Sequence, residues 1–415
     1  MPRRGSQRRT ARVRRLGLLL RHNVPRAQQP GPDGEAGRVK IAYCRVWDTE
    51  YPRNARIRAF LEEQLDAEIT ITRRREGPRW RRMLHDLRAL LFTVHGRRVY
   101  ILSEFSLPYV AVVWAVARLN RGVLVADGFV GQYETMVEDW KKARPGSLRA
   151  RWYALVDTMA CALADLVLID TRVRAQQLAA AHPGTDVLSL PVGAPGWARP
   201  ATGTAADRRR AADEPLRVLY YGNYIPLHGP PVIVEALATL GAAVPLEATF
   251  IGDGTLRASI RARAAELGIA GQCRFLEPVP AIELADHLAA ADVVLGIFGD
   301  SPKARSVIAN KVWQGLAAGK TVVTRSSPAL EEVAGAVGES LVQVDGSSPA
   351  ELVSALAAAL RSIGEPGPDA ARRSRGARGV RRLRIRSLRR ETDGTRRIAV
   401  ARHARVAALA GIWQT

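Results

Sequence analysis

Short apolar runs alternate along this chain with segments whose apolar residues recur at helical spacing. In the first half, the runs predict strands at 39–44, 68–72, 99–105, 122–127, 164–170 and 187–193. The intervening segments 53–65, 80–92, 108–120 and 147–164 are predicted to be helices. Strands that are apolar on both faces are typical of a parallel sheet covered by helices on two sides. The first half is therefore predicted to be a doubly wound α/β domain.

The second half repeats the same alternation. Its predicted strands are 216–224, 246–252, 273–278, 291–298, 320–324 and 340–345, and its predicted helices lie near 230–240, 255–267, 281–290, 310–318, 328–335 and 349–362. Residues 196–215 lack apolar periodicity and are predicted to be a linker. We expect two Rossmann-like domains, 39–195 and 216–364, facing a central cleft. Ligands of such sheets bind beyond the carboxyl ends of the strands.

Charge is concentrated at the two ends of the chain. Of a net charge of +22, residues 1–38 carry +8 and residues 366–415 carry +11, so the remainder carries +3. We expect basic disordered tails at 1–38 and 365–415, with a short helix near the end of the second. Such tails would attract an anionic membrane surface rather than a specific nucleic acid. A coding bias toward arginine explains the composition equally well.

Cysteine usage and hydropathy indicate a cytoplasmic location. The three cysteines, Cys44, Cys161 and Cys273, are widely spaced, which disfavours a zinc site or a disulfide framework. No apolar run approaches the ~18 residues of a membrane span. Residues 73–91 pass from a basic segment into an amphipathic helix containing Trp80. That composition is typical of helices that lie on a membrane surface, although an ordinary surface helix fits it as well.

Residues 299–324 carry the densest candidate chemistry. The segment reads as a polar basic loop, a helix beginning near Asn310, and a strand, and it holds Lys303, Lys311 and Lys320 of only six lysines in the chain. A helix N-terminus offers unpaired N–H groups and a positive dipole end, which suit a diphosphate. Lysine adds a point charge on phosphate, and an arginine such as Arg305 can contact two oxygens. A solvated surface loop is the alternative.

Ordered motifs in both halves resemble one enzyme family. In the second half these are YYGNYIPLHG (220–229), FIGDG (250–254), ADVVLGIFG (291–299) and NKVWQGLAAGKTVVT (310–324); in the first half they are YPRNARI (51–57), DGFVGQYETMVEDWK (127–141) and ADLVLIDT (164–171). Together they resemble glycosyltransferase family 4, the group 1 glycosyltransferases of GT-B fold. The resemblance covers roughly residues 39–360. It implies a retaining hexosyltransferase of polysaccharide biosynthesis that moves a sugar from a UDP- or GDP-linked donor to a glycan or lipid-linked glycan acceptor, without a metal cofactor.

The resemblance assigns roles to particular residues. Lys303 and Lys311 would stabilise the leaving diphosphate and Asp127 would orient the acceptor hydroxyl, so these three are the candidate catalytic residues. The candidate donor-binding residues are Gly222, Asn223, His228, Gly229, Asp253, Arg305, Asn310, Val312 and Gln314. The candidate acceptor-binding residues are Arg53, Asn54, Tyr133 and Glu134. No metal ligands are expected.

Four positions depart from the usual pattern of the family. An arginine and a lysine commonly stand where this chain has Asn223 and His228, and two acidic residues commonly stand where it has Ser306 and Gln314. The missing cations would have to come from elsewhere, which again points to Lys303, Arg305 and Lys311. The departures leave open a second interpretation, a catalytically inactive scaffold of glycosyltransferase fold. Asp127 and Arg53 also have plain structural interpretations, as caps of a turn and a helix.

Overall fold

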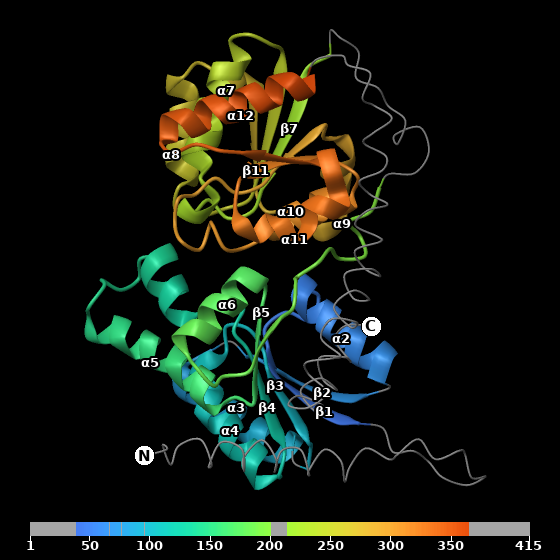
Figure 1. Ribbon diagram of the computed structural model, residues 1–415, viewed down its shortest axis with the longest axis vertical. Coiled ribbons are helices and arrows are strands. Elements are labelled where there is room, and N and C mark those ends of the chain that lie inside the picture. Colours follow the sequence, from blue (N-terminus) through green and yellow to red (C-terminus); the bar gives the residue numbers. More distant parts are fainter. Residues whose placement is uncertain (1–38, 66, 76, 95, 201–213, 365–415) are drawn as a thin grey trace, which may run out of the picture.

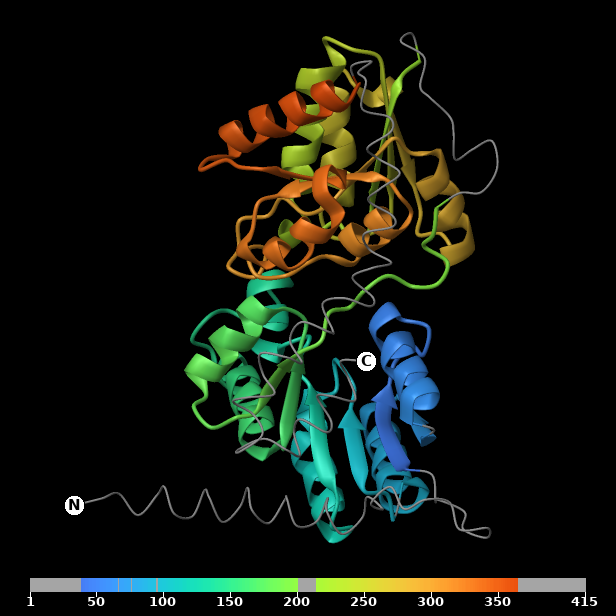
Figure 2. The same cartoon turned by 45° about the vertical axis from the view of Figure 1, so that its right-hand side comes forward.

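The computed structural model describes residues 39–364, except 66, 76, 95 and 201–213. The two predicted tails and most of the predicted linker lie outside the described residues. The described chain forms two domains, one above the other, each a parallel sheet between helices (Figures 1 and 2). The predicted fold class, two Rossmann-like doubly wound domains, is confirmed.

The first sheet has the strand order β2-β1-β3-β4-β5-β6. Its strands are β1 (Lys40–Val46), β2 (Glu68–Arg73), β3 (Val99–Leu102), β4 (Val123–Asp127), β5 (Leu166–Ile169) and β6 (Val187–Ser189). All of its neighbouring strands pair in parallel. Parallel neighbours cannot be joined by a tight hairpin, so the strands are connected by crossovers, and these crossovers contain helices.

Helices cover both faces of this sheet. The helical elements of the first domain are α2 (Pro52–Leu65), α3 (Arg79–Arg88), the π-helix η1 (Ala89–Thr93), η2 (Leu107–Tyr109), α4 (Val110–Leu119), the π-helix η3 (Glu134–Asp139), α5 (Leu148–Leu163) and α6 (Arg172–Ala181). Elements η1, α4 and α5 bury Leu90, Val113 and Val156 against one face. Helix α2 buries Ile57 and Leu61 against the other.

The second sheet has the order β12-β11-β10-β7-β8-β9. Its strands are β7 (Leu216–Tyr221), β8 (Leu246–Ile251), β9 (Cys273–Leu276), β10 (Val293–Leu295), β11 (Thr321–Arg325) and β12 (Leu341–Val344). Its helical elements are η5 (Pro226–His228), α7 (Pro230–Gly241), α8 (Arg257–Glu266), η6 (Ala270–Gln272), α9 (Ala281–Ala290), α10 (Asn310–Ala317), η7 (Pro328–Leu330), α11 (Glu331–Val337), η8 (Gly338–Ser340) and α12 (Pro349–Gly364). Helices α7, α8 and α12 share one core with the sheet, and α9, α10 and α11 share the other.

Several elements differ from the sequence prediction. Strands β3 and β6 end at Leu102 and Ser189 instead of at 105 and 193, and η3 was not predicted. Helix α6 was not predicted, because RVRAQQLAAA shows no apolar stripe; it is instead defined by its cap, where Thr171 Oγ1 accepts from the N–H of Arg174 at 3.3 Å. The predicted strand 291–298 ends as β10 at Leu295. The residues after Leu295 remain buried, which explains why their apolarity resembled that of a strand.

The two domains contact one another directly. A hydroxyl at the start of α6, Thr171 Oγ1, donates to the carbonyl of Ser306 at 2.6 Å. The backbone N–H of Arg172 donates to Glu332 Oε1, also at 2.6 Å. Phe129 and Val173 of the first domain pack on the core that holds α10. Trp197, which falls in the predicted linker, packs on that core as well.

The loop between β7 and α7 depends on a glycine. Gly229 has φ of +65°, and a Cβ there would lie 2.6 Å from the carbonyl carbon of Phe298. We expect Gly229→Ala to lower the free energy of unfolding by about 1–3 kcal/mol, through backbone strain and displacement of Phe298. Gly335→Ala in α11 is the matched control, because a Cβ there meets nothing within 4 Å, and it should be neutral or slightly stabilising. Equal effects of the two variants in urea denaturation would contradict the prediction.

Candidate functional site

The order of the second sheet has its topological switch point between β7 and β10. Counted from β7, the order is the doubly wound 3-2-1-4-5-6 pattern, whose connections leave in opposite directions at the first and fourth strands. In such sheets ligands bind beyond the carboxyl ends of those two strands. Gly222 follows β7, and the buried Phe298 lies beyond β10. The predicted donor loop therefore lies at this switch point.

Lys311 is the cation at this switch point. It is the second residue of α10 and is 4% exposed. Its Nζ lies 4.2 Å from the centre of the Tyr220 ring and 3.5 Å from where a Cβ of Gly222 would be. Among the described residues, no carboxylate pairs with Lys311, and burial lowers the pKa of its ammonium to about 7. A buried ammonium without a counter-charge suits an anionic ligand.

His228 is neutral and held by a backbone carbonyl. Its Nδ1 lies 2.6 Å from the carbonyl oxygen of Asn223, which also accepts from Tyr220 Oη at 2.8 Å. This contact places the ring proton on Nδ1. Burial and the nearby Lys311 hold the pKa of His228 well below its usual value. At this position the chain therefore offers a neutral imidazole.

The start of α10 also faces the first domain. Asn310 Nδ2 donates to Tyr51 Oη at 3.2 Å. One turn further on, Gln314 Oε1 accepts from Tyr221 Oη at 2.8 Å, so its carbonyl is engaged within the second domain. The side chain of Val312, predicted to contact the donor, instead packs in the core of α9, α10 and α11. Of these predicted donor residues, Asn310 lies nearest the domain interface.

Two of the predicted donor-loop cations pair with acidic groups. Lys303 Nζ reaches across the interface to Asp139 Oδ2 at 2.6 Å and Glu134 Oε2 at 3.5 Å. Arg305 is exposed and pairs with Asp300 in its own loop. Lys303 thus joins the donor loop to η3 of the first domain, and it would meet a diphosphate only by leaving these carboxylates.

The position of Lys320 contradicts the expectation that the lysines of residues 299–324 lie at one site. Its Nζ donates to the carbonyl of Ala289 at 2.6 Å. Lys320 precedes β11, so it lies at the amino ends of the strands, opposite the switch point. The concentration of lysine in residues 299–324 therefore does not bring all three ammonium groups to one site.

In the first domain, Arg53 and Asp127 bind each other. Arg53 donates from Nε and Nη2 to the two oxygens of Asp127 at 2.7 and 2.8 Å, and from Nη1 to the carbonyl of Leu190 at 2.6 Å. Both side chains are fully buried. The predicted catalytic carboxylate and the predicted acceptor-binding arginine thus form a structural pair that joins β4, α2 and the segment after β6.

The other predicted acceptor residues lie on either side of this pair. Asn54 donates to Glu104 Oε1 at 2.7 Å and accepts from Tyr43 Oη at 2.5 Å. Glu134 accepts from Arg174 Nη2 at 2.6 Å. The backbone N–H of Tyr133 donates to Asp157 Oδ2 at 2.9 Å. The structure brings Asn54 close to Arg53 and Asp127, while Tyr133 and Glu134 lie with η3.

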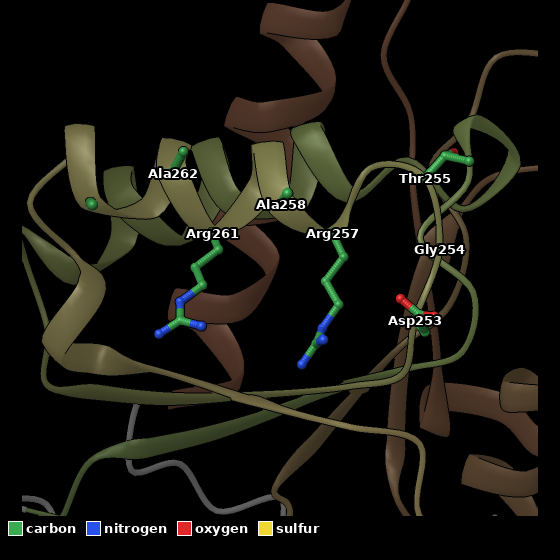
Figure 3. A pocket seen from close by; sticks show the side chains of 8 residues that line it. Asp253, Gly254, Thr255, Arg257, Ala258, Arg261 and Ala262 are labelled. Carbon is green, nitrogen blue, oxygen red and sulfur yellow. The ribbon is translucent and has the colours of Figure 1, made fainter.

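A separate groove opens along α8 (Figure 3). It encloses about 650 Å³, and Asp253, Gly254, Thr255, Arg257 and Arg261 line it together with three alanines. Arg257 and Arg261 point the same way from α8 in Figure 3. Glu277 Oε1 lies 2.5 Å from Arg257 Nη1. The side chain of the predicted donor residue Asp253 thus faces this groove.

Metal binding has no candidate site in the part of the chain that the structure describes. No group of three histidine, cysteine, aspartate or glutamate side chains lies close enough together there to hold an ion. The prediction of a metal-independent reaction stays a prediction.

Comparisons with known proteins support the family resemblance. Residues 215–362 match the family model described as glycosyl transferases group 1. A D-inositol 3-phosphate glycosyltransferase of Geodermatophilus obscurus is 33% identical over 212 residues, which cover 48% of this chain and 46% of that protein. One of the same name from Thermobispora bispora is 35% identical over 170 residues, 38% of each chain. The chain thus spans less than half the length of these curated relatives.

Solved structures agree on the fold. Sucrose-phosphate synthase from Thermosynechococcus elongatus superposes with a TM-score of 0.60 at 15% identity, covering 88% of this chain and 100% of that one. Anabaena HepE in complex with UDP superposes with a TM-score of 0.55 at 14% identity, covering 83% and 94%. The chain therefore has the GT-B fold. Its second domain matches the family model of group 1 glycosyltransferases, in agreement with the resemblance found in the sequence.

Sequence reasoning missed several groups at the domain interface. Glu104 and Tyr51 were predicted only as parts of a strand and a motif, and Arg174 had no predicted role; Asp139 was predicted to lie on the acceptor side, not to pair with Lys303. Glu104 could have been recognised as a candidate from the sequence, because a carboxylate directly after an apolar strand lies at the carboxyl edge of a parallel sheet. The pairing of Lys303 with Asp139 could not, because 164 positions separate the two residues.

Burial of Lys311 predicts a pH-dependent stability. Its pKa is about 7 in the folded protein and about 10.4 in an unfolded chain. Between these values the unfolded chain binds a proton that the folded protein lacks, so this group makes stability rise with pH, by up to about 1.4 kcal/mol per pH unit. We expect Lys311→Met to be more stable than the parent at pH 7, and we expect its free energy of unfolding to lack this rise with pH.

The measurement is urea denaturation between pH 6 and pH 10, plotted as the difference between variant and parent. Lys142→Met, which removes an exposed ammonium of the first domain, is the matched control and should leave the slope unchanged. A parallel pH dependence of Lys311→Met and the parent would show that Lys311 keeps its ordinary protonation in the folded protein.

Proposed function

We propose that this chain is a retaining glycosyltransferase that moves a sugar from a nucleoside diphosphate sugar to an acceptor hydroxyl held by the first domain. One observation carries the proposal: within a group 1 glycosyltransferase domain, the switch-point crevice holds a buried ammonium that no carboxylate of the described chain neutralises. The usual cationic positions of the family are Asn223 and His228 here. Lys311 supplies the charge that they lack.

The geometry suits stabilisation of a leaving diphosphate. Lys311 and the first N–H groups of α10 lie on one side of the crevice, and the loop at Gly222 lies on the other. An ammonium in a site shielded from water interacts more strongly with developing negative charge than one in bulk solvent. Binding of the anion would return a proton to Lys311, so donor affinity should fall as pH rises above about 7.

The comparisons bear on the donor and the acceptor in different ways. Anabaena HepE, which shares the fold, was solved with UDP, and this supports UDP as the first nucleotide to test. The curated relatives are named for D-inositol 3-phosphate, which adds a cyclitol phosphate to the glycan and lipid-linked acceptors expected from the sequence. Specificity for any of these would rest on side chains at the carboxyl edge of the first sheet.

Donor binding can be tested by thermal denaturation with UDP, GDP, ADP and their sugar conjugates. We expect one nucleotide to raise the melting temperature, because a ligand at 100 times its Kd stabilises the folded state by about 2.7 kcal/mol. Lys311→Ala should reduce that shift and lower kcat by about 10²–10³-fold, as expected for loss of one preorganised charge.

Lys142→Ala, which removes an exposed lysine, serves as the control and should match the parent. Unchanged kinetics in Lys311→Ala would refute the assignment of the donor site. Nucleotide binding without sugar transfer to any acceptor would favour the alternative of a non-catalytic scaffold.

We also propose that the first domain rests on a membrane surface through one helical layer. Of the exposed large apolar side chains in the described chain, most lie on α3, η1, α4 and α5, and among them only Ile282 belongs to the second domain. On α3 and η1 they are Trp80, Met83, Leu84, Leu87, Leu91 and Phe92, a single helical stripe. On α5 they are Leu148, Trp152 and Leu155, again one stripe.

Charge around these stripes complements an anionic surface. Exposed basic residues flank both of them: Arg73, Arg75, Arg81 and Arg88 near α3, and Lys141, Lys142, Arg149 and Arg151 near α5. Each basic group near an anionic bilayer contributes about 1 kcal/mol, and each buried large apolar side chain about 1.5–3 kcal/mol. No helix within the described ranges has both the length and the apolarity to cross a membrane, so the proposed contact is peripheral.

Vesicle flotation tests this contact. Leu84→Asp combined with Phe92→Asp places two charges in the α3 stripe at exposed positions, so folding should be unaffected. We expect binding to vesicles of phosphatidylglycerol and phosphatidylcholine to weaken by about tenfold or more. Ile282→Asp, at a 72% exposed position of the second domain, is the control. Equal flotation of the parent and both variants would contradict the membrane contact.

A further inference from the structure

The first sheet has a switch point of its own, between β1 and β3. In its order β2-β1-β3-β4-β5-β6, the chain leaves β1 in one direction and β3 in the other. The crevice rule applied to the second sheet therefore applies here too. Glu104 lies two residues after β3 and is 1% exposed.

Only one oxygen of the Glu104 carboxyl group has a hydrogen-bond partner. Its Oε1 accepts from Asn54 Nδ2 at 2.7 Å, and the same amide donates to the carbonyl of Asp48 at 2.8 Å. Oε2 is buried, and no donor in the described chain reaches it. An unpaired buried acceptor costs stability. Residues retained at such a cost are frequently functional.

The backbone beside Glu104 is strained. Phe105 has φ of +58°, a conformation that bulky residues rarely adopt. The turn is held in place by Ser103, whose Oγ donates to the carbonyl of Arg45 at 2.8 Å. Strain of this kind is concentrated at functional sites. Here it is combined with an oriented carboxyl group at the edge of the sheet.

Charged and titratable groups surround Glu104 from three elements. Asp127 of β4 repels it, while Arg53 and Asn54 of α2 favour its ionised form, and Tyr43 of β1 lies in the same cluster. Burial, followed by the charge of Asp127, raises the pKa of Glu104 to about 7. Arg53 already neutralises Asp127, and Arg174 pairs with Asp170, the other nearby carboxylate with an oxygen that lacks a partner, so Glu104 is the carboxylate here that has both a spare oxygen and no cation paired with it among the described residues.

Tyr51 connects this carboxyl group to the donor helix. The charge of Glu104 acts on Tyr51, whose Oη accepts from Asn310 Nδ2 at 3.2 Å. Asn310 precedes Lys311, the cation of the donor crevice. Glu104 therefore lies at the point where the edge of the first sheet meets the donor site.

We propose that Glu104 is the acceptor-binding carboxylate of this enzyme, and that its Oε2 accepts a hydrogen bond from a hydroxyl of a sugar or cyclitol acceptor. This inference rests on the proposed glycosyltransferase function. It gives Glu104 the role that the sequence analysis assigned to Asp127, whose oxygens bind Arg53. Glu104 is 1% exposed, and Asn54 also donates to the carbonyl of Asp48, so an acceptor would reach Oε2 only after a movement of the loop around Asp48.

The first test is stability against pH in Glu104→Gln, which keeps the shape and the contact with Asn54. The pKa of Glu104 is about 7 in the folded state and about 4.3 in the unfolded chain. Stability from this group is therefore present below the unfolded value and lost as pH rises through 7. We expect Glu104→Gln to melt at a higher temperature than the parent at pH 8 and at the same temperature at pH 5. Glu62→Gln, an exposed change on α2, should match the parent at both.

The second test is acceptor kinetics with the donor selected by thermal denaturation. The acceptor probes are myo-inositol 3-phosphate and octyl glycosides. Glu104→Gln should raise the acceptor KM by about tenfold or more, the effect of losing a hydrogen bond to a charged group. The melting shift produced by the nucleotide should stay that of the parent, because the donor crevice is intact.

Three outcomes separate the possibilities. A variant that melts lower than the parent by the same amount at both pH values shows a structural carboxyl group and overturns the proposal, as does an unchanged acceptor KM. The stability comparison needs no acceptor, so it can overturn the assignment even if none of the probes is used. Loss of any nucleotide effect in the parent itself would count against the proposed function instead.

Discussion

The rest of the site depends on one buried ammonium, that of Lys311. Removing an ammonium from water is unfavourable unless an anion compensates it, and no carboxylate of the described chain does so. The surrounding groups are a tyrosine ring, a neutral imidazole and glycine backbone, which leave the charge exposed to a ligand rather than neutralising it. Under the proposed function this uncompensated charge would meet the leaving diphosphate, and its burial lowers the stability of the free protein.

In the first domain, by contrast, a buried charge is compensated by an opposite charge within the protein. Arg53 and Asp127 form two hydrogen bonds with each other, and Arg53 also donates to the carbonyl of Leu190, which holds β4, α2 and the segment after β6 together. A buried pair of this kind stabilises geometry more than it stabilises folding. Asn54, which follows Arg53 on α2, donates to Oε1 of Glu104. The ionic pair and Glu104 are thus connected through neighbouring residues of one helix.

Much of the architecture could be predicted because parallel sheets leave a clear pattern. Strands buried on both faces read as continuous apolar runs, and amphipathic helices follow them, so both domains could be recognised. Helix α6 could not, since polar and alanine residues make it nearly uniform and its position depends on the Thr171 cap and on contacts with the second domain. The contacts of Val312 and Lys320 also could not be predicted, because apolar periodicity does not show which face or which end of a helix lies toward a ligand.

The sequence by itself determined the fold class, the resemblance of the second domain to the group 1 glycosyltransferases and the segment that holds Lys311, because these follow from local pattern and motif. Only the tertiary structure decided which charges remain available. Arg53 and Asp127, 74 positions apart, bind each other, and Lys303 meets Asp139 across the domain interface. Lys311 and Glu104 keep unpaired groups. Whether a charge is compensated depends on neighbours brought together by folding, and no local pattern in the chain contains that information.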